Sequence, residues 1–271
     1  MNARVDVGAS ADDDGATRAS SAGLANLAMY PFDAIRWAYD RFWEAVHDRL
    51  DWVPPQLDWG VDLHTSWSRD DLVVGYTCGW PLVTQLRDTV RVVGTFVAAT
   101  PQAEGHSYRS VLVARWPGDA ADFAGAVAAV NAFGSLSGWV SLVAAVHGAG
   151  GGWQGEVVVT GAHLDSLRAV GEGRADIASI DSVTLWQARR LMPELCDELV
   201  VVGTGPLVPC LPVITGRATT DQQLYDLRVA MVDAVFDPLV EPAARAMCTV
   251  GFTPLDLDAY LPILDLAPAP R

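Results

Sequence analysis

The sequence predicts an α/β protein that folds as two lobes, and three observations support this. The 271 residues, 51% of them hydrophobic, suffice for one large or two medium domains. Through the middle of the chain, short apolar runs alternate with helical patterns, which indicates mostly parallel sheets flanked by helices. This pattern changes near 105–112 and again near 200–206. We therefore expect a disordered tail at 1–23, lobe one at 24–108 plus 203–271, and lobe two at 109–202.

The first lobe is expected to begin as a strand followed by a helix. Pro31 and Asp33 suit a first helical turn, and apolar residues from Ile35 to Leu50 recur at helical spacing. The Trp- and Pro-rich residues that follow predict only a short strand near 61–64. The elements expected in this lobe are a strand at 24–29, a helix from about 33 to 50, a strand at 71–77, a helix at 82–88, strands at 91–99 and 211–215, and helices at 219–235 and 238–248, before a Pro-rich end.

The second lobe is expected to alternate regularly. Its elements are an extended run at 107–114, a helical turn at 120–124, a strand at 126–130, a helix at 138–147, a strand at 156–160, a helix at 162–172, a strand at 176–180, a helix at 182–191 and a strand at 199–203. Two chain crossings between the lobes would form a hinge, with a ligand cleft between them.

The charge balance argues against anionic partners. The chain has 33 acidic and 18 basic residues, a net charge of −15, and every basic residue is arginine. Nucleic acid and anionic membrane surfaces are therefore not expected as partners. An anion would have to be held by local dipoles and hydroxyl groups.

Targeting and cysteine patterns give a cytoplasmic protein as the expectation. The four cysteines show no C-x-x-C pair and no spacing typical of a zinc site, so they are interpreted as reduced thiols, and no metal or cofactor is expected. Residues 1–23 contain Asp12 to Asp14 and no apolar signal core. No stretch approaches the roughly 20 apolar residues of a membrane span.

A turn from Asn131 to Gly138, with the sequence NAFGSLSG, follows the expected strand 126–130. Ser135 or Ser137 suits the N-cap of the next helix, and Gly138 lets another group approach the backbone. Unpaired N–H groups at a helix start attract anions. An ordinary turn with a capped helix explains the same residues equally simply.

Other polar residues follow other strands, where ligands bind in open α/β sheets. They are Tyr30; Thr77 and Cys78; Ser135 and Ser137; Thr160, Gly161 and His163; and Asp181 and Ser182. Several have simpler explanations. His163 could cap a helix, Asp181 could be an N-cap, and Cys78 could be a small buried residue rather than an activated thiol.

Familiar catalytic motifs do not fit the chain. The glycine-rich stretch 148–155 precedes a strand, which is the wrong context for a dinucleotide site. In the stretch 134–138, GSLSG, Leu136 occupies the place of a nucleophile. A triad of Ser135, His163 and Asp181 would have to meet across three separate turns.

Five segments, taken in order, resemble the phosphonate- and phosphate-binding proteins of ABC importers. They are YTCGWP at 76–81, SYRSVLV at 107–113, the turn Asn131 to Gly138, TGAH with Ser166 at 160–166, and GRADIASIDS at 173–182. The resemblance covers roughly 24–216 and implies a type II periplasmic-binding-protein fold.

The resemblance also implies roles for individual residues. Ser135, Ser137 and the backbone near Gly138 would hold the phosphonate or phosphate oxygens with help from His163. Asp181 matches the carboxylate that faces the amine of aminophosphonate ligands. Tyr30 matches a tyrosine at the end of the first strand, and Thr77 and Cys78 would line the opposing lobe. Leu136 replaces a frequent hydroxyl residue and Phe133 a frequent proline, which predicts a lost anion contact and a more apolar pocket.

Three functions are compatible with these observations. The first is a cytoplasmic solute-binding protein that closes two lobes on a small anionic, phosphonate- or phosphate-like metabolite that can also carry an amine. The second is a cytosolic lyase or biosynthetic enzyme on the same scaffold, since fold alone does not decide function. The third is a ligand-sensing partner of another protein.

Overall fold

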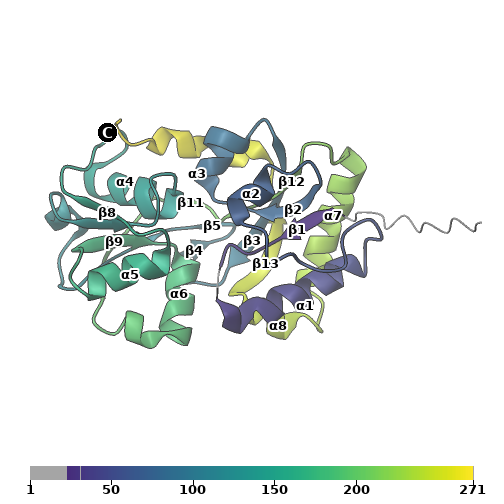
Figure 1. Ribbon diagram of the computed structural model, residues 1–271, viewed down its shortest axis with the longest axis horizontal. Helices are drawn as coiled ribbons and strands as arrows, with labels where there is room; N and C mark the ends of the chain where they lie inside the picture. Colours follow the sequence, from purple (N-terminus) through teal and green to yellow (C-terminus); the bar gives the residue numbers. More distant parts are fainter. Residues whose placement is uncertain (1–22, 31, 271) are drawn as a thin grey trace, which may run out of the picture.

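A computed structural model describes residues 23–30 and 32–270. Figure 1 shows two lobes side by side, the first formed by the purple, blue, yellow-green and yellow parts of the chain and the second mainly by the teal and green parts. Each lobe contains a five-stranded sheet. The tail expected at 1–23 lies, except for Gly23, outside the described residues.

The first sheet is covered by helices on both sides. Its strand order is β1 (Leu24–Asn26), β2 (Leu72–Tyr76), β12 (Pro212–Gly216), β3 (Val90–Ala98) and β13 (Thr249–Pro254). Helices α1 (Arg36–His47), α7 (Asp221–Val235) and α8 (Glu241–Ala246) lie together, while α2 (Leu63–Trp67) and α3 (Gly79–Pro81) lie across the sheet from α1 and α8 (Figure 1). The helical spacing predicted for α1 is confirmed, because Tyr39, Phe42 and Val46 are buried.

The second sheet has the order β10 (Val200–Thr204), β6 (Val111–Ala114), β9 (Ile177–Ile180), β7 (Ala128–Val130) and β8 (Val157–Val159). Helices α4 (Ser141–His147), α5 (His163–Gly171) and α6 (Ser182–Leu191) flank it. Successive residues of β9 belong to different core clusters: Ile177 is in the same cluster as Leu142, and Ala178 is in the same cluster as Leu167. Both faces of this sheet are buried, which explains its continuous apolar runs.

A three-stranded sheet of β11 (Val208–Pro209), β5 (Ser107–Tyr108) and β4 (Ala103–Glu104) lies where the chain passes between the lobes. The N–H of Gly205 donates to the Ser110 carbonyl, so the two crossings are bonded to each other. The run 107–114, expected as one extended segment, is therefore two strands, β5 and β6, in different sheets. The second lobe was predicted at 109–202, whereas β10 continues to Thr204.

The sheets flanked by helices are as expected, although each includes reversed strands: β6 runs against the other four strands of the second sheet, and β12 and β13 run against β1, β2 and β3 in the first. Two further expectations about the elements were wrong. The strand expected near 61–64 is the start of α2, because the Asp62 side chain accepts the Thr65 N–H at 2.9 Å and caps a helix. The Pro-rich end contains the edge strand β13.

The C-terminal segment makes a further contact between the lobes. It leaves β13 in the first lobe, forms a 3-10 helix at Leu261–Leu266, and reaches the second lobe (Figure 1). There the Ala269 N–H donates to the Gly151 carbonyl at 2.8 Å. The glycine-rich stretch 148–155 thus receives the end of the chain.

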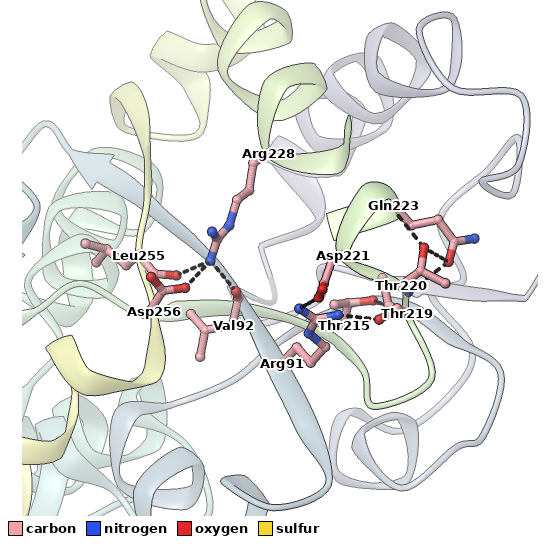
Figure 2. Close-up of polar contacts among 10 residues, drawn as sticks. All are labelled: Arg91, Val92, Thr215, Thr219, Thr220, Asp221, Gln223, Arg228, Leu255 and Asp256. Carbon is pink, nitrogen blue, oxygen red and sulfur yellow. Dashed lines mark hydrogen bonds and ion pairs between the residues drawn. The ribbon is translucent and has the colours of Figure 1, made fainter. Parts of the chain in front are cut away.

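Two arginines fasten α7 to the first sheet, as Figure 2 shows. Arg91 of β3 donates to the Thr219 carbonyl and the Asp221 carboxylate at the start of the helix. Arg228, within the helix, donates to backbone carbonyls of β3 and to Leu255 and Asp256 beyond β13. These bonds join three segments that are distant in the sequence.

Candidate functional site

The turn after β7 forms a capped helix start. Ser135 is the N-cap, and its hydroxyl accepts the Gly138 N–H at 3.0 Å. A π-helical turn at Leu136–Val140 follows and continues into α4. The Ser137 hydroxyl lies 2.8 Å from His163 Nε2, and the Ser137 carbonyl accepts the Ser179 hydroxyl of β9 at 2.6 Å. Two neighbouring elements therefore hold Ser137 in place.

A cleft of about 440 Å³ lies between the lobes at this turn. Six of the nine predicted site residues line it: Tyr30, Cys78, Ser135, Ser137, His163 and Asp181. Strand ends in both lobes supply them. This agrees with the expectation that ligands bind beyond the ends of the strands, referred to below as the strand-end rule.

The other three predicted residues do not line this cleft. Thr77 is fully buried, and its N–H donates to the Pro212 carbonyl within the first lobe. Leu136 is buried against Gly79. The Gly138 N–H, expected to face an anion, is used by the Ser135 hydroxyl. In the described part of the chain these three residues are thus placed behind the cleft lining rather than in it.

Asp181 is a helix cap and also lines the cleft. One carboxylate oxygen accepts the Thr184 N–H at 2.9 Å, and the other lies 3.5 Å from the Tyr30 hydroxyl of the first lobe. The residue is 2% exposed, and within the described part of the chain it has no arginine or histidine in an ion pair. A cationic group in the cleft would find this carboxylate without a competing cation.

Cys78 joins the two lobes. Its sulfur accepts the Leu136 N–H across the cleft at 3.4 Å. Burial raises the pKa of the thiol, although the N–H groups near it oppose this. Cys78 is therefore a neutral thiol at pH 7, and the interpretation as an activated nucleophile is not supported.

His163 is held in its neutral form. Burial lowers the pKa of the imidazole, and the Asp181 charge only partly opposes this. Its Nδ1 is buried and has no hydrogen-bond partner among the described residues. The ring can therefore exchange a hydrogen bond with Ser137 or with a ligand without carrying charge.

The lowered pKa of His163 predicts a loss of stability in mild acid. Above pH 6.5, the ordinary histidine value, the ring is neutral in both folded and unfolded chains. Below it the unfolded chain takes up the proton first, so the free energy of unfolding should fall until the folded-state pKa is passed. Denaturant unfolding from pH 8 to 5 should show a smaller decline for His163→Gln than for the parent. Two parallel curves would contradict the assignment.

The catalytic triad considered from the sequence is not assembled. His163 bonds to Ser137 rather than Ser135, and Asp181 bonds to Thr184 and Tyr30. Within residues 23–30 and 32–270, no three His, Cys, Asp or Glu side chains gather as a metal site.

Sequence reasoning missed several residues of the cleft. Asn131 directly follows β7, so the strand-end rule that selected Ser135 would also have found it. Asp62 and His64 also line the cleft, from the N-cap and the first turn of α2, a helix that was expected as a strand. These two residues were missed because the segment that carries them was assigned to a strand.

Comparison with known proteins places these observations in context. Residues 64–260 match the family model described as the phosphonate periplasmic substrate-binding protein of ABC transporters. No curated protein matches the chain. In the part of the chain described by the structure, no helix has the length and apolar character required to span a bilayer.

Solved structures share the fold at low sequence identity. PhnD1 from Prochlorococcus marinus, in complex with methylphosphonate, has a TM-score of 0.68 and 12% identity over 86% of this chain and 92% of its own. A binding component of an ABC phosphonate transporter from Pseudomonas aeruginosa has a TM-score of 0.64 and 15% identity over 86% and 80%. A Xanthomonas citri protein bound to ATP has a TM-score of 0.63 and 18% identity over 86% and 93%. These likenesses confirm the two-lobed fold.

Proposed function

Because the chain belongs to the family of phosphonate periplasmic substrate-binding proteins of ABC transporters, we propose that it binds a small phosphonate-like anion between its two lobes. The observation that carries this proposal is the convergence of Ser135, Ser137 and His163 on one cleft. Hydroxyl groups and a neutral imidazole can donate hydrogen bonds to phosphonate oxygens. The anion would thus be held without a positively charged side chain, since no arginine is among the described residues that line the cleft.

We further propose that the ligand carries an amine. Asp181 lies in the same cleft, is almost fully buried, and forms no ion pair with a described arginine or histidine. An ammonium group on the ligand would provide the missing counter-charge. Serine hydroxyls for the anion and a carboxylate for the cation together select a zwitterionic aminophosphonate.

Replacing Asp181 with asparagine tests recognition of the ammonium group separately from recognition of the phosphonate group. Asparagine keeps an oxygen for the Thr184 N–H, so the helix cap and the stability should be retained. Affinity for 2-aminoethylphosphonate should fall about tenfold, because the charged hydrogen bond to the ammonium is lost. Affinity for methylphosphonate, which has no amine, should change by less than about twofold. Equal losses for both ligands, measured by calorimetry, would remove the amine from the proposal.

The solute-binding function is tested by titration of the full chain with phosphate, methylphosphonate and 2-aminoethylphosphonate. Saturable binding of at least one of these anions is expected, and small-angle scattering should show compaction at saturation. No binding across the panel would overturn the function. The bound compound should be recovered unchanged, as judged by mass spectrometry. Turnover that is lost in His163→Ala would instead identify an enzyme on this scaffold.

A transporter is the expected partner, as the family's description implies. We propose that such a transporter would recognise the ligand-bound, closed form. In that form the two lobes would be fixed relative to each other and could be contacted together as one binding surface. The cytoplasmic location remains a prediction, which rests on the composition of residues 1–23 and on the cysteine pattern.

A further inference from the structure

We propose that the Asn131 side-chain amide is an additional anion donor of this site, and that Gly138 is required to orient it. The inference deepens the proposed function and rests on it. Asn131, the first residue of the turn, would supply a donor in place of the hydroxyl that is missing at Leu136.

The turn has fewer free donors than its sequence suggests. Leu136 has no hydroxyl group, and its N–H donates to the Cys78 sulfur in the other lobe. The Gly138 N–H donates to the Ser135 hydroxyl. Two backbone N–H groups at this helix start are therefore already used within the protein, and an anion depends more strongly on side-chain donors.

Asn131 is placed to supply one. It follows β7, and its carbonyl accepts the Gly161 N–H at 3.1 Å, which fixes its backbone beside the next turn. The residue lines the cleft, yet its Oδ1 is buried and has no partner among the described residues. Since Oδ1 faces the protein, the other polar atom of the amide, Nδ2, faces the cleft.

Gly138 leaves the space that the Asn131 amide occupies. A Cβ at position 138 would lie 1.9 Å from Asn131 Oδ1, a distance that no side chain can occupy. The oxygen therefore rests against the Gly138 Cα, where a weak C–H···O contact is available. The reversed amide would direct both N–H donors at an aliphatic group and an oxygen at the anion, which is unfavourable. Glycine thus permits the one orientation that offers donors to the cleft.

The test compares Asn131→Asp, Asn131→Ala and Gly138→Ala with the parent in titrations with methylphosphonate. Asn131→Asp has the same shape, keeps an oxygen over Gly138, and places a carboxylate oxygen where Nδ2 stood. It should weaken binding about a hundredfold at pH 7.5, because like charges would then face each other. Asn131→Ala should weaken binding about tenfold through the lost donor. A merely structural role for Asn131 would leave Asn131→Asp within about twofold of the parent.

The role of Gly138 is tested by a double-mutant cycle with Asn131. Gly138→Ala should also weaken binding about tenfold in the parent, but by no more than about twofold in the Asn131→Ala background, because the displaced amide is already absent. Additive losses would overturn the orienting role. If Gly138→Ala does not fold, as judged by circular dichroism, the isosteric Asn131→Asp variant alone decides whether the amide is a donor.

The outcomes separate this inference from the function on which it rests. Methylphosphonate binding by the parent with an unchanged or improved affinity in Asn131→Asp overturns the Asn131 assignment and leaves the binding function intact. A parent that binds no anion of the panel overturns both. A crystal structure with bound methylphosphonate should place a phosphonate oxygen within hydrogen-bond distance of Asn131 Nδ2, and an anion bound without that contact would also refute the assignment.

Discussion

Replacing Ser137 with alanine should weaken methylphosphonate binding by about 1–3 kcal/mol, roughly a 5- to 150-fold rise in Kd. Ser137 is 3% exposed, lines the cleft, and is held by His163 on its hydroxyl and by Ser179 on its carbonyl. Such a preorganised hydroxyl loses little freedom when an anion binds. Its removal therefore deletes a hydrogen bond to a charged group, and titration calorimetry measures the difference.

The matched control is Ser141→Ala, one turn further along the same helix. The Ser141 hydroxyl is buried against Ser110 and is outside the described lining of the cleft, so methylphosphonate affinity should stay within about twofold of the parent. Equal affinities of Ser137→Ala and the parent would exclude this turn from the site. Equal losses in both serine variants would indicate a general weakening of the helix instead.

Replacing Arg228 with alanine should lower the free energy of unfolding by about 2–4 kcal/mol. The guanidinium donates to the Val92 carbonyl at 3.0 Å, to the Leu255 carbonyl at 2.8 Å and to the Asp256 carboxylate at 2.6 Å (Figure 2). It also donates to the Val93 carbonyl at 3.0 Å. Its side chain is only 21% exposed. Alanine would leave carbonyl groups near β3 and β13 without these donors. A buried acceptor that loses its hydrogen bond lowers the free energy of unfolding by more than the net value of the bond.

Arg174→Ala is the control for a simple surface ion pair. The Arg174 side chain is 52% exposed and bonds only to the Glu172 carboxylate among the side chains described. Its removal should change the free energy of unfolding by less than about 1 kcal/mol. Urea unfolding of both variants provides the comparison. A similar small change in both would show that the bonds of Arg228 add little to the stability of the first sheet.

Much of the architecture was predictable because its signals are local. The periodic apolar residues of α1 and the apolar runs of β7 and β9 identify their elements directly. The mixed direction of the strands was not predictable in the same way. A buried strand has the same apolar composition whether its neighbour is parallel or antiparallel, and β12 acquires its place between β2 and β3 only when distant segments pair.

The sequence by itself determined that polar residues follow several strands, and this identified six residues of the cleft. It also determined that Leu136 removes one hydroxyl from the anion turn. Only the tertiary structure decided which donors remain available. Hydrogen bonds across lobes and turns use the N–H groups of Leu136 and Gly138, and close packing on Gly138 orients Asn131. These contacts join segments far apart in the chain, or depend on distances that differ by fractions of an ångström. The order of residue types along the chain contains neither kind of information.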